Sequence, residues 1–419
     1  MKLFSPLLKD KKSRNSVYLY SGHFTEYLIS FLALPFISRA IGPEKLGLVG
    51  FTQLFGILMF LIIEFGSPLL AVREVVRKKF HKNELAIFVE KITSFKIFLI
   101  PLVFLISIAT FFLVPKFQGY YEFLFFATLG AVFQGLTPTW YFEGLEKIKY
   151  QVLTKLFFRA LFLLLIIYFV ESEKDAVLVI IINSICSFFV FSLLFYKMKS
   201  ELVRFSLINI NESIKIGKKS IQSFIISITP IIYQNISLAL LSYLIDPARF
   251  GLLIGSIKIH TAFHNLYGPL SQVFYPYLNN LEYNENKNVN QNVFKYLIIL
   301  LFIGLVIGLF LYSFSDWIIS LLLGPNFFKS KTILQAYSIA LPLTAISNAL
   351  CRQWLMIKGY DYFYSIIQIT GLIVSLFILI ILVEKFGALS APLSFISYES
   401  TLIFLTIIKM IRHKNVFKI

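Results

Sequence analysis

The chain has 419 residues, of which 58% are hydrophobic and 15% are charged, and its formal net charge is +17. Soluble proteins carry about 25% charged residues, whereas here long apolar runs recur from end to end, each able to cross ~30 Å of hydrocarbon. This composition excludes an ordinary soluble domain and predicts an all-α polytopic membrane protein.

Twelve membrane spans are predicted in chain order. The first follows a basic segment at residues 1–16. It is too long for the core of a signal peptide and has no small-residue cleavage site, so we expect it to remain as a span. The predicted spans are 17–40, 46–70, 85–114, 120–143, 151–170, 176–196, 219–243, 251–277, 294–322, 332–356, 363–383 and 388–410.

Positive charges alternate between the connecting loops. With the N-terminus in the cytoplasm, the cytoplasmic segments hold 25 lysines and arginines and the outer loops hold 7. Because cytoplasmic loops are enriched in these residues, we expect both termini in the cytoplasm. The net charge is then a consequence of topology, and no nucleic-acid partner is expected.

A short polar joint between the first two spans returns near the middle of the chain. Pro43 aligns with Pro247 and Gly47 with Gly251, at an offset of 204 positions. Each copy interrupts one helix and begins another, and proline suits the first turn of the new helix because it has no N–H to leave unpaired. The joint therefore indicates an internal repeat.

A weaker echo pairs residues 140–150 with residues 354–364. A repeat at about half the chain length is typical of transporters built from two related helix bundles. We therefore predict an N-terminal six-helix lobe at 1–200, a cytoplasmic linker at 201–218 and a C-terminal six-helix lobe at 219–419.

No cofactor or metal motif is found. The linker segment Gly217-Lys-Lys-Ser220 lacks the first glycine of a phosphate loop, because Glu212 stands there. Cys186 and Cys351 lie inside apolar runs and are interpreted as small packing residues. We expect neither a nucleotide, a metal nor another cofactor.

Several cations lie inside predicted spans, where charge is costly and usually faces a cavity or a partner. Arg159 lies roughly 13 Å deep, at 1.5 Å per residue, and Lys258 is similarly deep from the outer face. Each is a candidate for binding an anionic substrate, or else for an internal ion pair. Arg352 either binds substrate or extends to the cytoplasmic interface, and Arg39 could assist near the exit.

Three carboxylates are candidates for ion coupling, namely Glu26, Glu64 and Glu399. Each would bind a proton or Na⁺, or else neutralise a nearby cation. Three lysines near the inner ends of their spans are interpreted as side chains that extend to the interface: Lys91, Lys96 and Lys155.

Polar residues on the first, seventh and eighth spans are expected to line a cavity. They are His23, Gln234, Asn235, His260 and His264. The two histidines of the eighth span are four residues apart, but without further ligands a polar lining is preferred to a metal site. Amides and phenols suit a sugar, and cations suit a phosphate. Together they favour a lipid-pyrophosphate-linked glycan over a hydrophobic drug.

Three stretches resemble polysaccharide-biosynthesis flippases of the Wzx type. The first is Leu-Pro-Phe-Ile-Ser-Arg-Ala-Ile-Gly-Pro-Glu-Lys-Leu-Gly at residues 34–47. The others are Pro-Thr-Trp-Tyr-Phe-Glu-Gly-Leu-Glu at 138–146 and Leu-Gly-Pro-Asn-Phe-Phe at 323–328. The resemblance extends over the whole chain, including its length and its twelve spans.

The resemblance implies the MOP-type fold shared with multidrug extruders and lipid II flippases, with two six-helix lobes in a V around a central cavity. It also implies transport of undecaprenyl-pyrophosphate-linked O-antigen units across the bacterial inner membrane. The cationic cavity of such flippases would correspond to Lys258, Arg159 and Arg352. A polysaccharide polymerase and a chain-length regulator are the implied protein partners.

We therefore predict a lipid-linked oligosaccharide flippase, not an enzyme, that works by alternating access. One alternative is a multidrug cation antiporter of the same fold, although its cavity would be dominated by acidic residues. A second is an O-antigen polymerase or ligase, which usually needs a long external loop. A sugar-porter fold is disfavoured because the loop at 73–79 lacks the Gly-x-x-x-Asp-Arg pattern.

Overall fold

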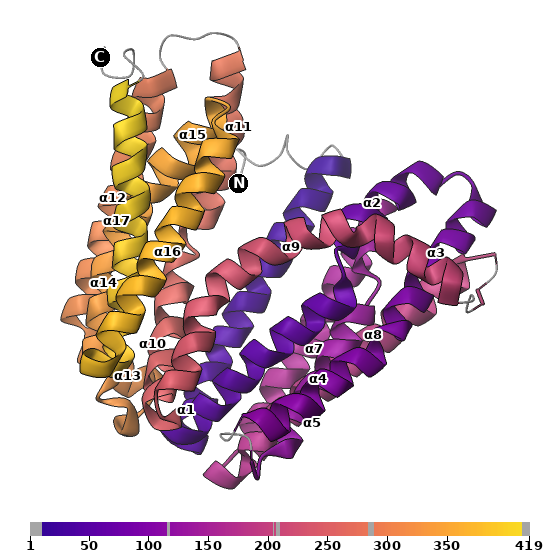
Figure 1. Ribbon diagram of the computed structural model, residues 1–419, viewed down its shortest axis with the longest axis horizontal. Coiled ribbons are helices and arrows are strands. Elements are labelled where there is room, and N and C mark those ends of the chain that lie inside the picture. Colours follow the sequence, from indigo (N-terminus) through magenta and orange to yellow (C-terminus); the bar gives the residue numbers. More distant parts are fainter. Residues whose placement is uncertain (1–10, 115–117, 204, 207–209, 284–288, 413–419) are drawn as a thin grey trace. The chain divides into compact units, whose positions relative to one another are not determined.

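The computed structural model describes residues 11–114, 118–203, 205–206, 210–283 and 289–412, and this part of the chain is built from helices (Figure 1). The first half comprises α1 (Lys11–Glu64), α2 (Ser67–Lys78), α3 (Lys82–Phe98), α4 (Ile100–Leu113), α5 (Tyr121–Leu136), α6 (Thr139–Gly144), α7 (Ile148–Phe169), the 3₁₀ turn η2 (Glu173–Asp175) and α8 (Ala176–Glu201). The second half comprises α9 (Ile210–Leu244), α10 (Pro247–His264), α11 (Tyr267–Tyr283), α12 (Val289–Ser313), α13 (Ser315–Leu322), η3 (Pro325–Phe327), α14 (Ser330–Ser347), the π-helix η4 (Asn348–Trp354), α15 (Leu355–Ile357), α16 (Asp361–Phe386), η5 (Gly387–Leu389) and α17 (Ser390–Arg412).

Seven helical stretches within the described residues are long and apolar enough to cross a membrane. Two of them are at least twice as long as the ~20 residues of a single crossing. Phe24–Glu64 has 41 residues and is interrupted at Gly42, and Asp361–Arg412 has 52 and contains both α16 and α17. The protein is therefore an all-helical, multi-pass membrane protein, as the composition predicts.

The chain forms two compact units, which are considered separately. The N-terminal unit comprises residues 1–41 and 48–236, and the C-terminal unit comprises residues 42–47 and 237–419. The division falls within α9, which already begins at Ile210, inside the linker expected at 201–218. Much of that linker is thus the first part of a long helix.

Several predicted spans are broken into two helices. The span expected at 85–114 consists of α3 and α4, because Pro101 lies in the first turn of a new helix. Between α1 and α2, Gly66 has a φ of 69°, and a Cβ there would lie 2.3 Å from the backbone nitrogen of Phe224. Only glycine permits both the left-handed backbone and the close approach of α9.

In the N-terminal unit, α8 packs against both α5 and α7. The tryptophan motif of the weaker echo forms α6, and Trp140 and Phe142 are buried there against α2 and α3. A Cβ on Gly144 would lie 2.6 Å from a methyl group of Val75. This motif therefore packs a helix junction.

In the C-terminal unit, α12 packs along α14, and α16 packs along α17 (Figure 1). Gly304 and Gly308 of α12 allow the close approach, since a Cβ on Gly308 would lie 2.8 Å from the Ser338 carbonyl oxygen. Small residues at such interfaces are favoured in membranes because packing, not the hydrophobic effect, holds the helices together.

The two repeated joints touch each other. A Cβ on Gly47 would lie 1.9 Å from the Pro247 carbonyl oxygen, and a Cβ on Gly251 would lie 1.7 Å from the Pro43 carbonyl oxygen. Asp246 caps α10 by accepting a 2.9 Å hydrogen bond from the Arg249 amide. The contact is reciprocal, so the residues that repeat in sequence also pack as equivalent partners.

Candidate functional site

Arg159 is the centre of a polar network inside the N-terminal unit. Its Nε and Nη2 atoms donate hydrogen bonds of 3.0 and 2.6 Å to Ser30 Oγ on α1. Its Nη1 donates a 3.5 Å bond to Asn183 Oδ1 on α8. The guanidinium carbon also lies 5.0 Å from the centre of the Phe162 ring, one turn further along α7. The group is thus fixed by neutral partners from two other helices.

Both partners are themselves held in place. Ser30 Oγ donates a 2.6 Å hydrogen bond to the backbone carbonyl of Glu26, one turn earlier on α1. Ser187 Oγ bonds the Asn183 carbonyl at 2.7 Å and accepts a 3.1 Å bond from Gln134 Nε2 on α5. The network therefore crosses four helices and orients the guanidinium.

Glu26 is the predicted ion-coupling residue that the structure brings close to Arg159. It lies half-buried on α1 and interacts electrostatically with the guanidinium. An internal ion pair is one of the two roles that the sequence predicts for Arg159, and substrate binding is the other. Substitution of Arg159 distinguishes between them.

Lys96 forms a second buried site. The interpretation from the sequence, in which Lys96 extends to the interface, is therefore wrong. Its side chain is only 2% exposed, and its Nζ donates a 2.8 Å hydrogen bond to the Gly135 carbonyl oxygen. Gly135 lies in the last turn of α5, where backbone carbonyls lack helical partners and attract cations. Glu64 lies near enough to interact electrostatically with both Lys96 and Lys155. The burial of Lys96 could have been predicted from its depth in the membrane, since Lys96 lies about 11 residues into its predicted span.

The histidines of α10 form an aromatic stack in the C-terminal unit. The His260 ring lies 5.9 Å from the His264 ring and 4.9 Å from the Tyr337 ring of α14. His260 is 5% exposed, and its Nε2 has no hydrogen-bond partner among the described residues. Within the same part of the chain, no group of three or more His, Cys, Asp or Glu side chains is placed as metal ligands would be.

Glu399 of α17 is the most deeply buried of the three predicted ion-coupling carboxylates. It is 7% exposed and lies beside Ser347, the last residue of α14. Its Oε2 has no hydrogen-bond partner among the residues that the structure describes. A buried carboxylate with one free oxygen has room to take up a proton or a cation.

The remaining candidates are distributed over both units. Arg352 is exposed in η4, and it interacts electrostatically with His264. π-Helical segments such as η4 are frequent at functional sites. Lys258 is half-buried in α10. Thus Arg159 and Lys258, both expected to bind the substrate, belong to different units.

Three further candidates can be placed only in part. Arg39 is exposed near the end of the first section of α1. Asn235 of α9 donates a 2.8 Å hydrogen bond to the Ile231 carbonyl within its own helix. The side chains of His23 and Gln234 lie outside the described residues.

Comparison with known proteins decides the family. The family model described as polysaccharide biosynthesis protein matches residues 13–282, which is more than half of the chain. This protein belongs to the polysaccharide biosynthesis protein family. The match includes Arg159 and Lys258, whereas Arg352 and Glu399 lie beyond its end.

Two relatives of this family member align with nearly its whole length. A protein of Escherichia coli (strain K12) is 23% identical over 393 residues, which cover 92% of this chain and 93% of the relative. A protein of Shigella dysenteriae is 24% identical over 404 residues, which cover 95% of this chain and 100% of the relative. Each bears the name "Putative O-antigen transporter".

Solved structures show the fold of this family member. The lipid II flippase MurJ in an inward closed conformation aligns with a TM-score of 0.67 and 14% identity, over 96% of this chain and 89% of that one. An inward-facing multidrug resistance MATE transporter of the MOP superfamily aligns with a TM-score of 0.68 and 13% identity, over 94% and 96%. The expected resemblance to the MOP fold is therefore confirmed.

Proposed function

We propose that this protein is a flippase that moves undecaprenyl-pyrophosphate-linked units of O-antigen or another surface polysaccharide from the cytoplasmic to the periplasmic face of the bacterial inner membrane. Twelve spans, in two six-helix lobes around a central cavity, would work by alternating access. The proposal is supported by family membership and by the two full-length relatives. A polysaccharide polymerase and a chain-length regulator would act on the product.

The observation that carries the proposal is the guanidinium of Arg159, which the hydroxyl of Ser30 and the amide of Asn183 hold inside the unit. A guanidinium is the side chain best suited to phosphate, because its planar donors match two phosphate oxygens. The hydrogen-bond partners that orient the group are neutral, and the carboxylate of Glu26 is the charge with which a pyrophosphate would compete for it. Lys258 and Arg352 would contribute from the other unit, with Arg39 assisting near the exit.

Ion coupling is proposed at Glu399, with Glu26 and Glu64 as weaker candidates. Glu399 is buried and keeps one oxygen without a partner among the described residues. Glu26 and Glu64 lie instead in the fields of Arg159 and Lys96, which favour a charge-balancing role. A proton or Na⁺ bound at Glu399 would remove the cost of an unpaired buried carboxylate. A Glu399→Gln variant should then lose any dependence of transport on the ion gradient.

The test is genetic complementation in the protein's own host. The gene is deleted and restored as wild type, Arg159→Gln, Arg159→Lys, Lys258→Ala or the exposed control Lys329→Ala. Surface polysaccharide and lipid-linked units at the cytoplasmic face are both measured. We expect the deletion to lose surface polysaccharide and trap the units inside, with rescue by wild type and the control but not by Arg159→Gln.

The outcomes separate the function from the site. Rescue by every variant would keep the flippase and remove Arg159 and Lys258 from its mechanism. Normal surface polysaccharide in a deletion strain that has no second flippase would overturn the proposal. The multidrug antiporter would then be favoured, because the same fold with a buried Glu399 suits an organic cation.

A further inference from the structure

A cavity of about 370 Å³ lies in the N-terminal unit where α2, α3 and α9 meet. Four apolar side chains, here called the apolar wall, line it: Leu70, Ile87, Phe88 and Ile216. The rest of the lining is charged and consists of four lysines (Lys78, Lys91, Lys215 and Lys219) and three carboxylates (Glu74, Glu84 and Glu212). The cavity is therefore amphipathic, and its charged lining has one more lysine than carboxylates.

The position of the cavity follows from the distribution of charge along the chain. Three of its lysines, Lys78, Lys215 and Lys219, belong to the segments around 73–82 and 197–219, which are among the most basic cytoplasmic connections of the predicted topology, whereas Lys91 lies near the inner end of the predicted span 85–114. With the predicted topology, the cavity would lie at the cytoplasmic boundary of the membrane.

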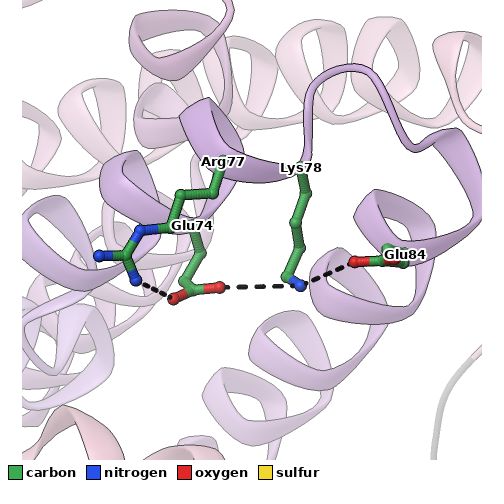
Figure 2. Close-up of polar contacts among 4 residues, drawn as sticks. All are labelled: Glu74, Arg77, Lys78 and Glu84. Carbon is green, nitrogen blue, oxygen red and sulfur yellow. Dashed lines mark hydrogen bonds and ion pairs between the residues drawn. The ribbon is translucent and has the colours of Figure 1, made fainter.

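Carboxylates already bridge these cations. Figure 2 shows Glu74 between Arg77, at 3.4 Å, and Lys78, at 3.9 Å, while Lys78 also reaches Glu84 at 3.1 Å. Glu212, also in the lining, contacts Lys91 at 2.9 Å and Lys215 at 2.5 Å. The Glu212 carboxylate therefore pairs with one lysine of α3 and one lysine of α9, as a bound anion would.

The Glu212 carboxylate is a permanent competitor for those lysines. Hydrogen bonds from Lys215 and Lys91 lower the pKa of Glu212 from 4.5 to about 2. It is thus ionised at any physiological pH, and another anion must displace it. Lys219 makes no ion pair among the described residues, so this lysine of the cavity can contact a phosphate before Glu212 is displaced.

We propose that this cavity binds the phosphate of an anionic lipid of the cytoplasmic leaflet. The lysines would contact the phosphate, in exchange for Glu212, and an acyl chain would lie against Leu70 and Phe88. Basic pockets between helices on the cytoplasmic side bind such head groups. The cavity shares no lining residue with the Arg159 network, and the proposal does not depend on the proposed function.

The apolar wall favours a lipid over a soluble phosphate. A free phosphate would gain nothing from four apolar side chains, whereas a lipid buries its first methylenes there at about 0.8 kcal/mol per CH₂. The ion pair of Glu212 with Lys91 attaches the first turn of α9 to α3, and the 2.8 Å hydrogen bond from the Ser206 amide to Glu90 attaches the segment before α9 to the same helix. Lipid binding would therefore change the contacts of α9, the helix that connects the two halves of the chain.

The experiment uses the full-length protein in vesicles of phosphatidylcholine containing phosphatidylglycerol, and measures which lipids remain bound by native mass spectrometry. We expect preferential retention of phosphatidylglycerol. Lys219→Gln should weaken it about fivefold, and Lys215→Gln/Lys219→Gln more strongly, as one surface lysine is worth about that factor. The matched control is Lys218→Gln, the exposed neighbour that does not line the cavity.

A variant with the opposite sign guards against simple misfolding. Glu212→Gln removes the internal competitor, so it should increase phosphatidylglycerol retention. Inorganic pyrophosphate is the second probe, and it should compete only weakly if the apolar wall contributes. Strong binding of pyrophosphate with no lipid preference would replace the lipid with a soluble phosphate. Equal retention of both lipids by wild type, or unchanged retention in the lysine variants, would overturn the proposal.

Discussion

The N-terminal unit and the C-terminal unit differ in how their buried ionisable side chains are satisfied, although neutral groups that lack a partner within the described part of the chain, such as Ser184 Oγ and Gln353 Oε1, occur in both. In the first, Arg159 and Lys96 each find neutral oxygen acceptors on neighbouring helices. In the second, His260 and Glu399 each keep a polar atom that has no partner among the described residues. Satisfied groups hold a structure in place, whereas unsatisfied ones can change protonation or accept a ligand.

The difference does not involve the two Pro/Gly joints, which repeat in sequence, contact each other and both lie in the C-terminal unit. Side chains elsewhere in the chain therefore give the two units their different chemistry. A fixed cation in one unit and a titratable pair of sites in the other is a division of roles that mutation can test.

The largest effect is expected where the two halves are alike. Gly47→Ala and Gly251→Ala each place a Cβ within 2 Å of a proline carbonyl oxygen, and overpacking against backbone should cost about 3 kcal/mol or more. We expect little folded protein from either variant, measured by monodisperse yield in detergent. Gly268→Ala, whose Cβ would meet nothing within 4 Å, is the control. Normal yield of the first two would show that the joints are not tightly packed.

The buried lysine should come next. Lys96→Met leaves the Gly135 carbonyl and the charge of Glu64 without their cation, which should lower the free energy of unfolding by about 1–3 kcal/mol. Adding Glu64→Gln should recover part of that loss, because the second charge is then absent as well. Thermal unfolding of the single and double variants measures the interaction free energy between Lys96 and Glu64. Strictly additive losses would show that the two residues do not interact.

Arg159 should show a smaller effect on stability than on transport. Arg159→Lys keeps the charge but cannot donate to Ser30 and Asn183 together, so we expect a loss of about 1–2 kcal/mol. Ser30→Ala should resemble it, while leaving the guanidinium in the unit. If Ser30→Ala lowers transport as much as Arg159→Gln does, orientation of the guanidinium is what transport requires. Wild-type transport in Ser30→Ala would show that transport requires the charge of Arg159 but not its orientation by Ser30.

The smallest effect is a pH dependence at the cytoplasmic surface. Because the folded pKa of Glu212 is about 2 and its ordinary value is 4.5, its ion pairs stabilise the fold fully above 4.5. That contribution should disappear as the pH falls from 4.5 to about 2. The melting temperature of wild type should therefore approach that of Glu212→Gln over this range. A constant difference between the two would contradict the assignment.

The sequence alone determined the membrane class, the repeated joints and the family resemblance. These follow from one-dimensional properties: the length of apolar runs, the side on which positive charges gather, and the spacing of Pro43 and Gly47 from Pro247 and Gly251. The depth of Arg159 could be estimated as well, since depth depends only on the distance from the end of a span.

Only the tertiary structure decided which partners these residues meet. Arg159 bonds to Ser30, which lies 129 residues away, and Lys96 caps α5 although its position suggested an interface. The direction in which a membrane helix faces is poorly marked in its sequence, because lipid-facing and buried positions are both apolar. The breaks at Gly66 and Pro101 and the burial of Glu399 likewise depend on neighbouring helices, which hydropathy does not describe.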